Sequence, residues 1–347
     1  MMIKYFNYKK PFTLEAGDTL PELQIAYTTS GILSPSGDNV IWVCHPLTGN
    51  ADVEEWWPGI AGHGTVLDPD KYFIVCANMT GSCFGSTGPD SINPITGARY
   101  CHSFPLITIK DMVKGFQLLQ HELGIQKIHL GIGGSMGGQQ VLEWAVTDPL
   151  LFDNLFLIAT NARHSAWGIA FNAAQRMAME ADPTFFNQCD DDYAGQKGLK
   201  AARAIALLSC RHQNAYRKTQ TDFNDKLDDY KASSYQYNEG EKITRRFTAH
   251  AYYTLIKAMD THNIGRSRTS VRKALREITA RTMIIGIKSD LLFPYAEQKF
   301  LAANITDSRF KLIDSLYGHD GFLIEDKLIS EHIRKFLEEV NSSPAKK

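Results

Sequence analysis

The sequence lacks the features that mark membrane, nucleic-acid and metal-binding proteins. It has no apolar run long enough to cross a membrane, and its start is charged without an apolar segment of secretory length. The net charge is −1 and no lysine- and arginine-rich run occurs, which argues against nucleic-acid binding. The six cysteines form no C-x-x-C pair and have no histidine neighbours at zinc spacing. We therefore expect a cytoplasmic globular protein with reduced cysteines, no bound metal, and no nucleic-acid or membrane partner.

Short strand-like runs are present along the chain, and helical patterns separate them. The later runs are continuously apolar rather than alternating, which is typical of strands buried on both faces of a parallel sheet. Strands and helices in alternation predict the α/β class with a mostly parallel central sheet. The expected strands cover residues 23–27, 39–44, 72–77, 127–132, 154–160, 282–287 and 309–314.

The segment 163–279 breaks this alternation. Its patterns are helical, as in "AFNAAQRMAMEA" and "GLKAARAIALLS", and it contains no convincing strand. A segment of this length between two sheet strands is too long for a simple crossover. We expect residues 1–162 and 280–347 to form a core, and residues 163–279 to form a helical insertion that covers the carboxyl edge of the sheet as a lid.

A glycine-rich stretch, "GIGGSMGGQQ", joins a predicted strand to a predicted helix. It does not fit the dinucleotide motif, because Met136 stands where the last glycine is needed, nor the phosphate loop, because Gln139 follows Gly138. It does fit G-x-S-x-G with Ser135 at the centre, which is the nucleophile elbow, a strained turn that exposes a serine. The pattern predicts Ser135 as a nucleophile; the alternative is a tight glycine turn without a catalytic role.

A serine nucleophile needs a base that accepts its proton and an acid that orients the base. With this elbow, the acid and the base follow the serine along the chain, on loops after later strands. Asp290 follows the strand predicted at 282–287, and His319 follows the strand predicted at 309–314. We predict Asp290 as the acid and His319 as the base. Asp314 also ends a strand and is the alternative acid.

The oxyanion of an acyl-transfer intermediate needs backbone N–H donors. One donor is predicted at Met136, the residue after the nucleophile, and the second on a loop after an early strand. The stretch "VCHPLTGNA" forms such a loop and offers Leu47 or Thr48, of which we take Leu47. The remaining histidines, including His45, are interpreted as structural.

Together these stretches resemble the homoserine O-acetyltransferase family, an acyltransferase branch of the α/β-hydrolases. The resemblance covers nearly the whole chain and is carried by "CHPLTGNA", "GSCFGSTGPDSINPITG", "FPLITIKDMV", "GGSMGGQQVLEWA", "GLKAARAIALL", "SDLLFP" and "YGHDGFL". It implies an α/β-hydrolase fold with Ser135 as nucleophile, Asp290 as acid and His319 as base. It also implies that Arg203 binds the carboxylate of the substrate and that Asp320 binds its ammonium group, pairings that are chemically sound.

For the reaction, the resemblance implies ping-pong transfer of an acetyl group from acetyl-CoA to the hydroxyl of homoserine, a step of methionine biosynthesis. It implies no permanently bound cofactor and no metal, and it predicts a homodimer because relatives are commonly dimers. The loop "LTGNADVEEWW" and the segment "CRHQNAYRKTQTDFND" depart from the family's pattern. These departures leave open a succinyl donor or a serine acceptor, both of which occur among relatives.

Two other interpretations stay open at this point. An esterase has the same elbow and triad, although a hydrolase of apolar esters has no use for Arg203 and Asp320. A non-catalytic binding protein on the same scaffold would be expected to have lost one of the three catalytic side chains.

Overall fold

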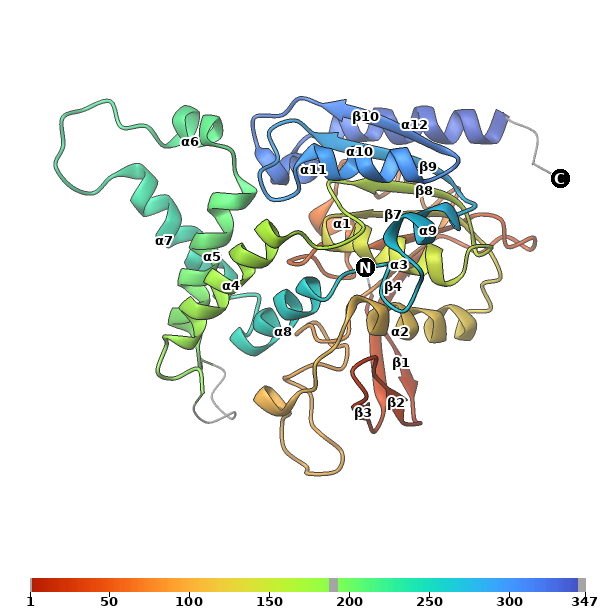
Figure 1. The fold of residues 1–347 in the computed structure, drawn as a ribbon, viewed down its shortest axis with the longest axis horizontal. Coiled ribbons are helices and arrows are strands. Elements are labelled where there is room, and N and C mark those ends of the chain that lie inside the picture. Colours follow the sequence, from red (N-terminus) through yellow and green to blue (C-terminus); the bar gives the residue numbers. More distant parts are fainter. Residues whose placement is uncertain (1, 187–192, 343–347) are drawn as a thin grey trace.

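The computed structural model describes residues 2–186 and 193–342, and its centre is an eight-stranded sheet (Figure 1). The strands are β1 (Lys4–Tyr8), β4 (Leu23–Ser30), β5 (Val40–Cys44), β6 (Phe73–Ala77), β7 (Ile128–Gly134), β8 (Phe152–Ile158), β9 (Arg281–Ile287) and β10 (Ser308–Ile313). Their order across the sheet is β1-β4-β6-β5-β7-β8-β9-β10. The pairs β1–β4 and β4–β6 are antiparallel, and the pairs from β6 to β10 are parallel. The predicted α/β class with a mostly parallel sheet is confirmed.

Every strand that the sequence predicted is present, with ends that differ by a few residues. The sequence analysis missed β1 and the short pair β2 (Phe12–Thr13) and β3 (Thr19–Leu20). β1 lies at the edge of the sheet, and its side chains are exposed or half-buried. A strand in this position has no apolar run to mark it, because it buries little surface against the core.

Apolar side chains pack against both faces of the sheet, which explains the continuously apolar strands. Val40, Trp42 and Cys44 of β5 belong to the core on one face, whereas Ile41 and Val43 belong to the core on the other. This burial specifies the strand register, because a slip of one residue would exchange the two faces. The first face is covered by α2 (Ile109–Glu122), α3 (Met136–Thr147) and α10 (Tyr295–Asn304), and the second by α1 (Val53–Trp56), α11 (Gly321–Ile324) and α12 (Asp326–Ser342).

Between β8 and β9 the chain is helical. The helices are α4 (Ala166–Glu180), α5 (Gln196–Cys210), α6 (Gln213–Gln220), α7 (Lys231–Thr244), α8 (Ala249–Asp260) and α9 (Val271–Arg276). Within the described part of this segment, the β-structure is limited to an isolated bridge between Arg163 and Asn263. α4, α5, α6 and α7 project to one side of the sheet (Figure 1). The segment then returns to the core, where α9 packs against α10 and Arg268 pairs with Glu143 of α3 at 2.8 Å.

Two expectations from composition can be compared with the structure. Cys101 is disulfide-bonded, so the expectation of reduced cysteines is wrong for this residue, whereas Cys44, Cys76, Cys83 and Cys210 are free. Disulfide pairing depends on which residues the fold brings together, and sequence spacing alone does not reveal this. Over the described ranges, each helix is too short or too polar to span a bilayer.

Candidate active site

Ser135 lies at a sharp turn between β7 and α3. Its backbone has φ 56° and ψ −127°, which is a strained conformation for a residue with a side chain. The glycines permit this turn: a Cβ on Gly133 would lie 2.5 Å from Gly137 C, and a Cβ on Gly137 would lie 2.1 Å from Cys44 O. Ser135 N–H donates to Ile158 O of β8 at 3.0 Å. The turn thus presents the serine side chain at the carboxyl edge of the sheet.

The three side chains predicted as a triad form one hydrogen-bonded chain. His319 Nε2 lies 2.9 Å from Ser135 Oγ, and His319 Nδ1 lies 2.7 Å from Asp290 Oδ2. The Asp290 carboxylate can only accept, so Nδ1 carries the proton and Nε2 is free to accept the proton of the serine hydroxyl. All three residues are buried. The arrangement is that of a nucleophile, a base and an acid that orients the base.

Local contacts hold the acid and the base in place. Asp290 Oδ1 accepts from the backbone N–H groups of Leu292 at 2.9 Å and Phe293 at 2.8 Å. The Phe293 ring stacks on the His319 imidazole with 5.0 Å between centroids. Burial disfavours the imidazolium, but the neighbouring Asp290 outweighs this effect, and the pKa of His319 is raised above its ordinary value.

The alternative acid, Asp314, points into solvent. Its side chain is 82% exposed and lies 4.0 Å from Lys288 Nζ. Of the two carboxylates that follow neighbouring strands, Asp290 is the one within hydrogen-bonding distance of His319.

The predicted oxyanion donors lie beside the serine. Met136 is the first residue of α3, so its N–H has no acceptor within the helix. Leu47 lines the same cavity as Ser135 and His319. Neither the Leu47 N–H nor the Met136 N–H donates to a backbone carbonyl within the described part of the chain. Neither N–H group is thus committed to a backbone hydrogen bond there, which a donor to an oxyanion requires.

A cavity of ≈ 260 Å³ opens between the sheet edge and the helices α4, α5 and α8. Ser135 and His319 lie on its wall from the sheet side. Most of the charged side chains that line the cavity are cationic. Arg203, Arg211 and Arg246 line it, and Asp320 is the one carboxylate among the described residues that do so. A cavity of this charge favours anionic or zwitterionic ligands.

Arg203, the predicted carboxylate binder, lies in α5 and contributes to this cavity. Burial disfavours its charge, but neighbouring groups, Cys210 and Tyr252 first among them, leave the pKa of Arg203 raised above its ordinary value. The Tyr252 hydroxyl donates to Gln175 Oε1 at 2.7 Å, and both of these side chains also line the cavity. Arg203 is therefore a permanent cation among polar groups. The sequence analysis missed Tyr252 and Gln175, which no motif marks.

Asp320, the predicted ammonium binder, already has a cationic partner. Its Oδ2 lies 2.7 Å from Arg211 Nε, although the angles are not those of a hydrogen bond. Arg211 immediately follows α5, and the sequence analysis missed it because the contact depends on how α5 packs over the loop of Asp320. An ammonium group at Asp320 would have to share the carboxylate with Arg211 or displace it.

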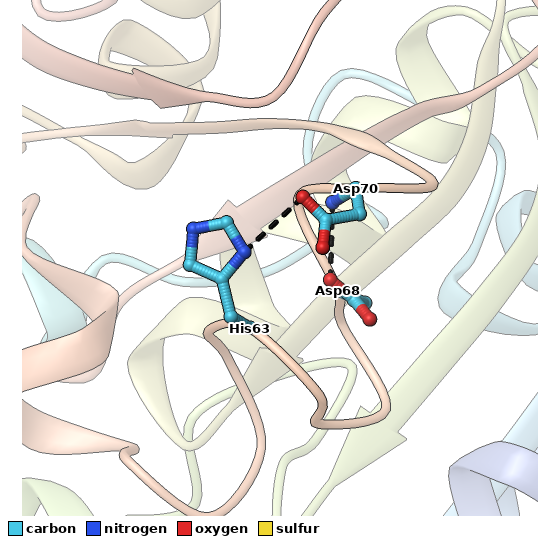
Figure 2. Close-up of side chains that lie close together, drawn as sticks. All are labelled: His63, Asp68 and Asp70. Atoms are coloured by element: carbon cyan, nitrogen blue, oxygen red, sulfur yellow. Dashed lines mark hydrogen bonds and ion pairs between the residues drawn. The ribbon is translucent and has the colours of Figure 1, made fainter.

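A cluster of possible metal ligands lies away from this site. Ligand-type atoms of His63, Asp68 and Asp70 are within 4.8 Å of one another (Figure 2). His63 pairs with Asp70 at 3.2 Å, and the Asp68 carboxylate accepts from the N–H groups of Asp70 at 3.0 Å and Gly64 at 3.3 Å. These contacts indicate that the two carboxylates stabilise the loop. The loop precedes β6, at the amino end of the parallel strands, opposite the edge that carries Ser135.

Known proteins share this fold and its motifs. Residues 39–326 match a family model described as alpha/beta hydrolase fold, so the fold and the site define an α/β-hydrolase, and the predicted fold is confirmed. The solved structure of esterase E22 is 21% identical, with a TM-score of 0.87, and the match covers 97% of this chain and 100% of that chain. At this identity the likeness shows the fold alone.

Closer relatives narrow the assignment. The homoserine O-acetyltransferase of Cyclobacterium marinum is 43% identical over 341 residues, which are 98% of this chain and 97% of that protein. The solved structure of homoserine O-acetyltransferase from Staphylococcus aureus is 26% identical, with a TM-score of 0.81, and the match covers 100% of this chain and 97% of that chain. The chain belongs to the homoserine O-acetyltransferase family of enzymes, and the resemblance found in the sequence is confirmed.

Proposed function

We propose that this enzyme transfers an acetyl group from acetyl-CoA to the γ-hydroxyl of L-homoserine through an acyl-enzyme at Ser135. The observation that carries the proposal is the chain Ser135–His319–Asp290, which opens into a cavity that also contains Arg203 and Asp320. A nucleophile next to partners for a carboxylate and an ammonium group suits an amino-acid acceptor. The reaction would serve methionine biosynthesis.

In the first half-reaction, Ser135 Oγ attacks the thioester carbon of acetyl-CoA while His319 Nε2 takes the hydroxyl proton. The N–H groups of Leu47 and Met136 stabilise the oxyanion that forms. The C–S bond then breaks, and the CoA sulfur receives the proton from the imidazolium. The products are the acetyl ester of Ser135 and free CoA.

The second half-reaction uses the same groups in the same order. His319 takes the proton of the homoserine hydroxyl, whose oxygen attacks the carbonyl carbon of the acetyl ester. The bond from that carbon to Ser135 Oγ breaks, and the serine oxygen regains the proton from His319. O-Acetylhomoserine leaves, and the enzyme returns to its starting state.

The acceptor is proposed to bind by its charged groups. The Arg203 guanidinium pairs with the α-carboxylate, and Asp320 holds the α-ammonium group. The Arg211 contact is to Oδ2 of Asp320, and an ionised carboxylate can accept at both oxygens, so Asp320 can also bind the ammonium group. Arg211 then stays next to Asp320, and its positive charge disfavours the binding of more than one further cation at this carboxylate.

The helical segment is proposed to act as a lid and to pair two copies of the chain. A lid suits this reaction because water competes with homoserine for the acetyl ester. Pairing would bury apolar side chains that are exposed in one copy. The exposed side chains on or near α5, α6 and α7 include Leu208 (56%), Phe223 (91%), Leu227 (94%) and Tyr237 (79%). The mass of the protein in solution tests the dimer: a monomer alone would contradict it.

Product identification tests the proposed reaction. The enzyme is offered acetyl-CoA or succinyl-CoA against homoserine or serine, and products are identified by mass spectrometry. We expect O-acetylhomoserine to form faster than free acetate. The competing function is an esterase, because a hydrolase on this fold uses the same nucleophile, base and acid. Free acetate as the main product would favour it, and an O-succinyl or O-acetylserine product would correct the donor or the acceptor.

A further inference from the structure

His45 lies at the end of β5, directly before the oxyanion loop (residues 46–49), and its side chain is fully buried. His45 Nδ1 lies 2.9 Å from Pro46 O, and His45 Nε2 lies 3.4 Å from Met79 N. The proton transfers proposed above do not involve this imidazole. Its two contacts nevertheless connect the oxyanion loop to the chain after β6.

The partners of His45 dictate its protonation. Pro46 O can only accept and Met79 N–H can only donate, so Nδ1 carries a proton and Nε2 is a bare acceptor. A neutral imidazole meets both requirements, whereas an imidazolium would oppose the Met79 N–H with a second donor. Burial lowers the pKa of His45 to about 4. The side chain therefore stays neutral wherever His319 works as a base.

The Pro46 carbonyl is one end of the peptide unit whose other end is the Leu47 N–H. In a trans peptide the C=O and the N–H point in opposite directions, so fixing one direction fixes the other. Pro46 O accepts from His45 Nδ1 and also from Gly49 N at 2.9 Å. Two donors on one side of the peptide turn the Leu47 N–H toward the opposite side, and Leu47 lines the cavity that contains Ser135.

We infer that His45 is a positioning residue, which holds the Pro46 carbonyl so that the Leu47 N–H points to the place where the oxyanion forms. The inference rests on the proposed acyl-enzyme at Ser135. Arg246 Nη2 donates to Thr48 O at 3.1 Å, so the same loop is also held from the helical side. His45 acts from within the core, next to the peptide unit that supplies the donor.

Acylation of Ser135 by p-nitrophenyl acetate tests the inference without homoserine or CoA. The release of nitrophenolate in a burst gives the acylation rate constant and its KM in wild type and variants. His45→Leu removes both contacts and is expected to slow acylation by about 10- to 100-fold with little change in KM, because losing an oxyanion donor costs about 10²–10³. His45→Asn keeps an N–H donor at the position of Nδ1 and is expected to recover most of this loss. His129→Leu, at a half-buried histidine in β7, is the matched control and should acylate at the wild-type rate.

The outcomes separate this inference from the proposed function. Slow acylation in His45→Leu with unchanged KM, and recovery in His45→Asn, support the positioning role. Wild-type acylation in His45→Leu overturns it, while the proposed transferase stands. If wild type shows a burst but no transfer to homoserine, the proposed transferase fails and the positioning role is still decided by the variants. If wild type shows no nitrophenolate release and no acetyl adduct at Ser135, both fail.

A measurement on the unmodified protein covers the case in which His45→Leu does not fold. The ¹⁵N shifts of the His45 ring are expected to report the neutral Nδ1–H form, unchanged between about pH 5 and pH 9. An Nε2–H form, or titration within this range, overturns the inference, since Pro46 O would then lose its donor or Met79 N–H its acceptor.

Discussion

The carboxyl edge of the sheet and the helices between β8 and β9 hold their polar groups in different ways. At the sheet edge, Ser135, His319 and Asp290 are already joined by hydrogen bonds of 2.9 and 2.7 Å. In the helical segment, Arg203 and Arg211 reach the cavity from α5 and its end through long side chains. The hydrogen-bonded chain thus lies within the sheet edge itself, whereas the placement of the two arginines depends on how one helix packs over the sheet. Changes at the edge should lower the rate of chemistry, and changes in the helices should weaken binding.

The largest effect is expected at the nucleophile. Ser135→Ala removes the atom that forms the acyl-enzyme, and it should lower kcat by about 10⁶, as loss of a nucleophile does in serine hydrolases. Incubation with acetyl-CoA alone, followed by peptide mass analysis, should find the acetyl group on the peptide that contains Ser135 in wild type and no adduct in the variant. An adduct at another residue would falsify the assignment.

The orienting acid should give the next largest effect. Asp290→Asn favours the wrong imidazole tautomer and should lower kcat by roughly 10⁴. Asp314→Asn is the matched control, because Asp314 is exposed and pairs with Lys288 instead of His319. Steady-state kinetics of the two variants test which aspartate orients His319. A larger loss of kcat in Asp314→Asn would assign this role to Asp314.

Arg203 tests the helical side of the comparison. In Arg203→Ala, transfer to homoserine should weaken by roughly 1.5–3 kcal/mol, the range for a hydrogen bond to a charged group. This loss should appear mainly as a raised KM for homoserine, while acetylation of Ser135 by acetyl-CoA stays near the wild-type rate.

Arg217→Ala, at an exposed arginine in α6, is the matched control and should change neither half-reaction. If the first half-reaction collapses in Arg203→Ala while the second is spared, Arg203 serves the acyl donor and the proposed division between edge and helices fails.

The smallest expected effect is a shift in pH dependence. His319 must be neutral to take a proton, so kcat/KM should fall as pH falls through its pKa. Because Asp290 raises this pKa above the ordinary 6.5, the acidic limb should have its midpoint above 6.5. In Asp290→Asn, the midpoint measured on the residual activity should move to lower pH. Burial lowers the pKa of His319, and the carboxylate that raises it is then absent. A midpoint that does not move would mean that another group titrates.

The strands that the sequence analysis found differ in burial from β1, one of the strands that it missed. β7, β8 and β9 are covered on both faces, so most of their positions are apolar or glycine. β1 pairs along one side with β4, and its exposed side chains follow no apolar pattern. Apolar composition reports burial, and an edge strand that buries little is defined by its backbone hydrogen bonds instead.

The sequence by itself determined the features that depend on neighbours along the chain. The glycines around Ser135 permit the strained turn, and Asp290 and His319 follow strands of the sheet. Short sequence patterns therefore predict which residues lie at the sheet edge. Only the tertiary structure decided that Arg211 pairs with Asp320, that Asp314 faces solvent, and that His45 holds the oxyanion loop. The physical reason is that an ion pair or a hydrogen bond depends on distance and direction in space. Met79 and Arg211 come into contact with their partners only when the sheet and α5 pack. No local sequence pattern specifies that packing.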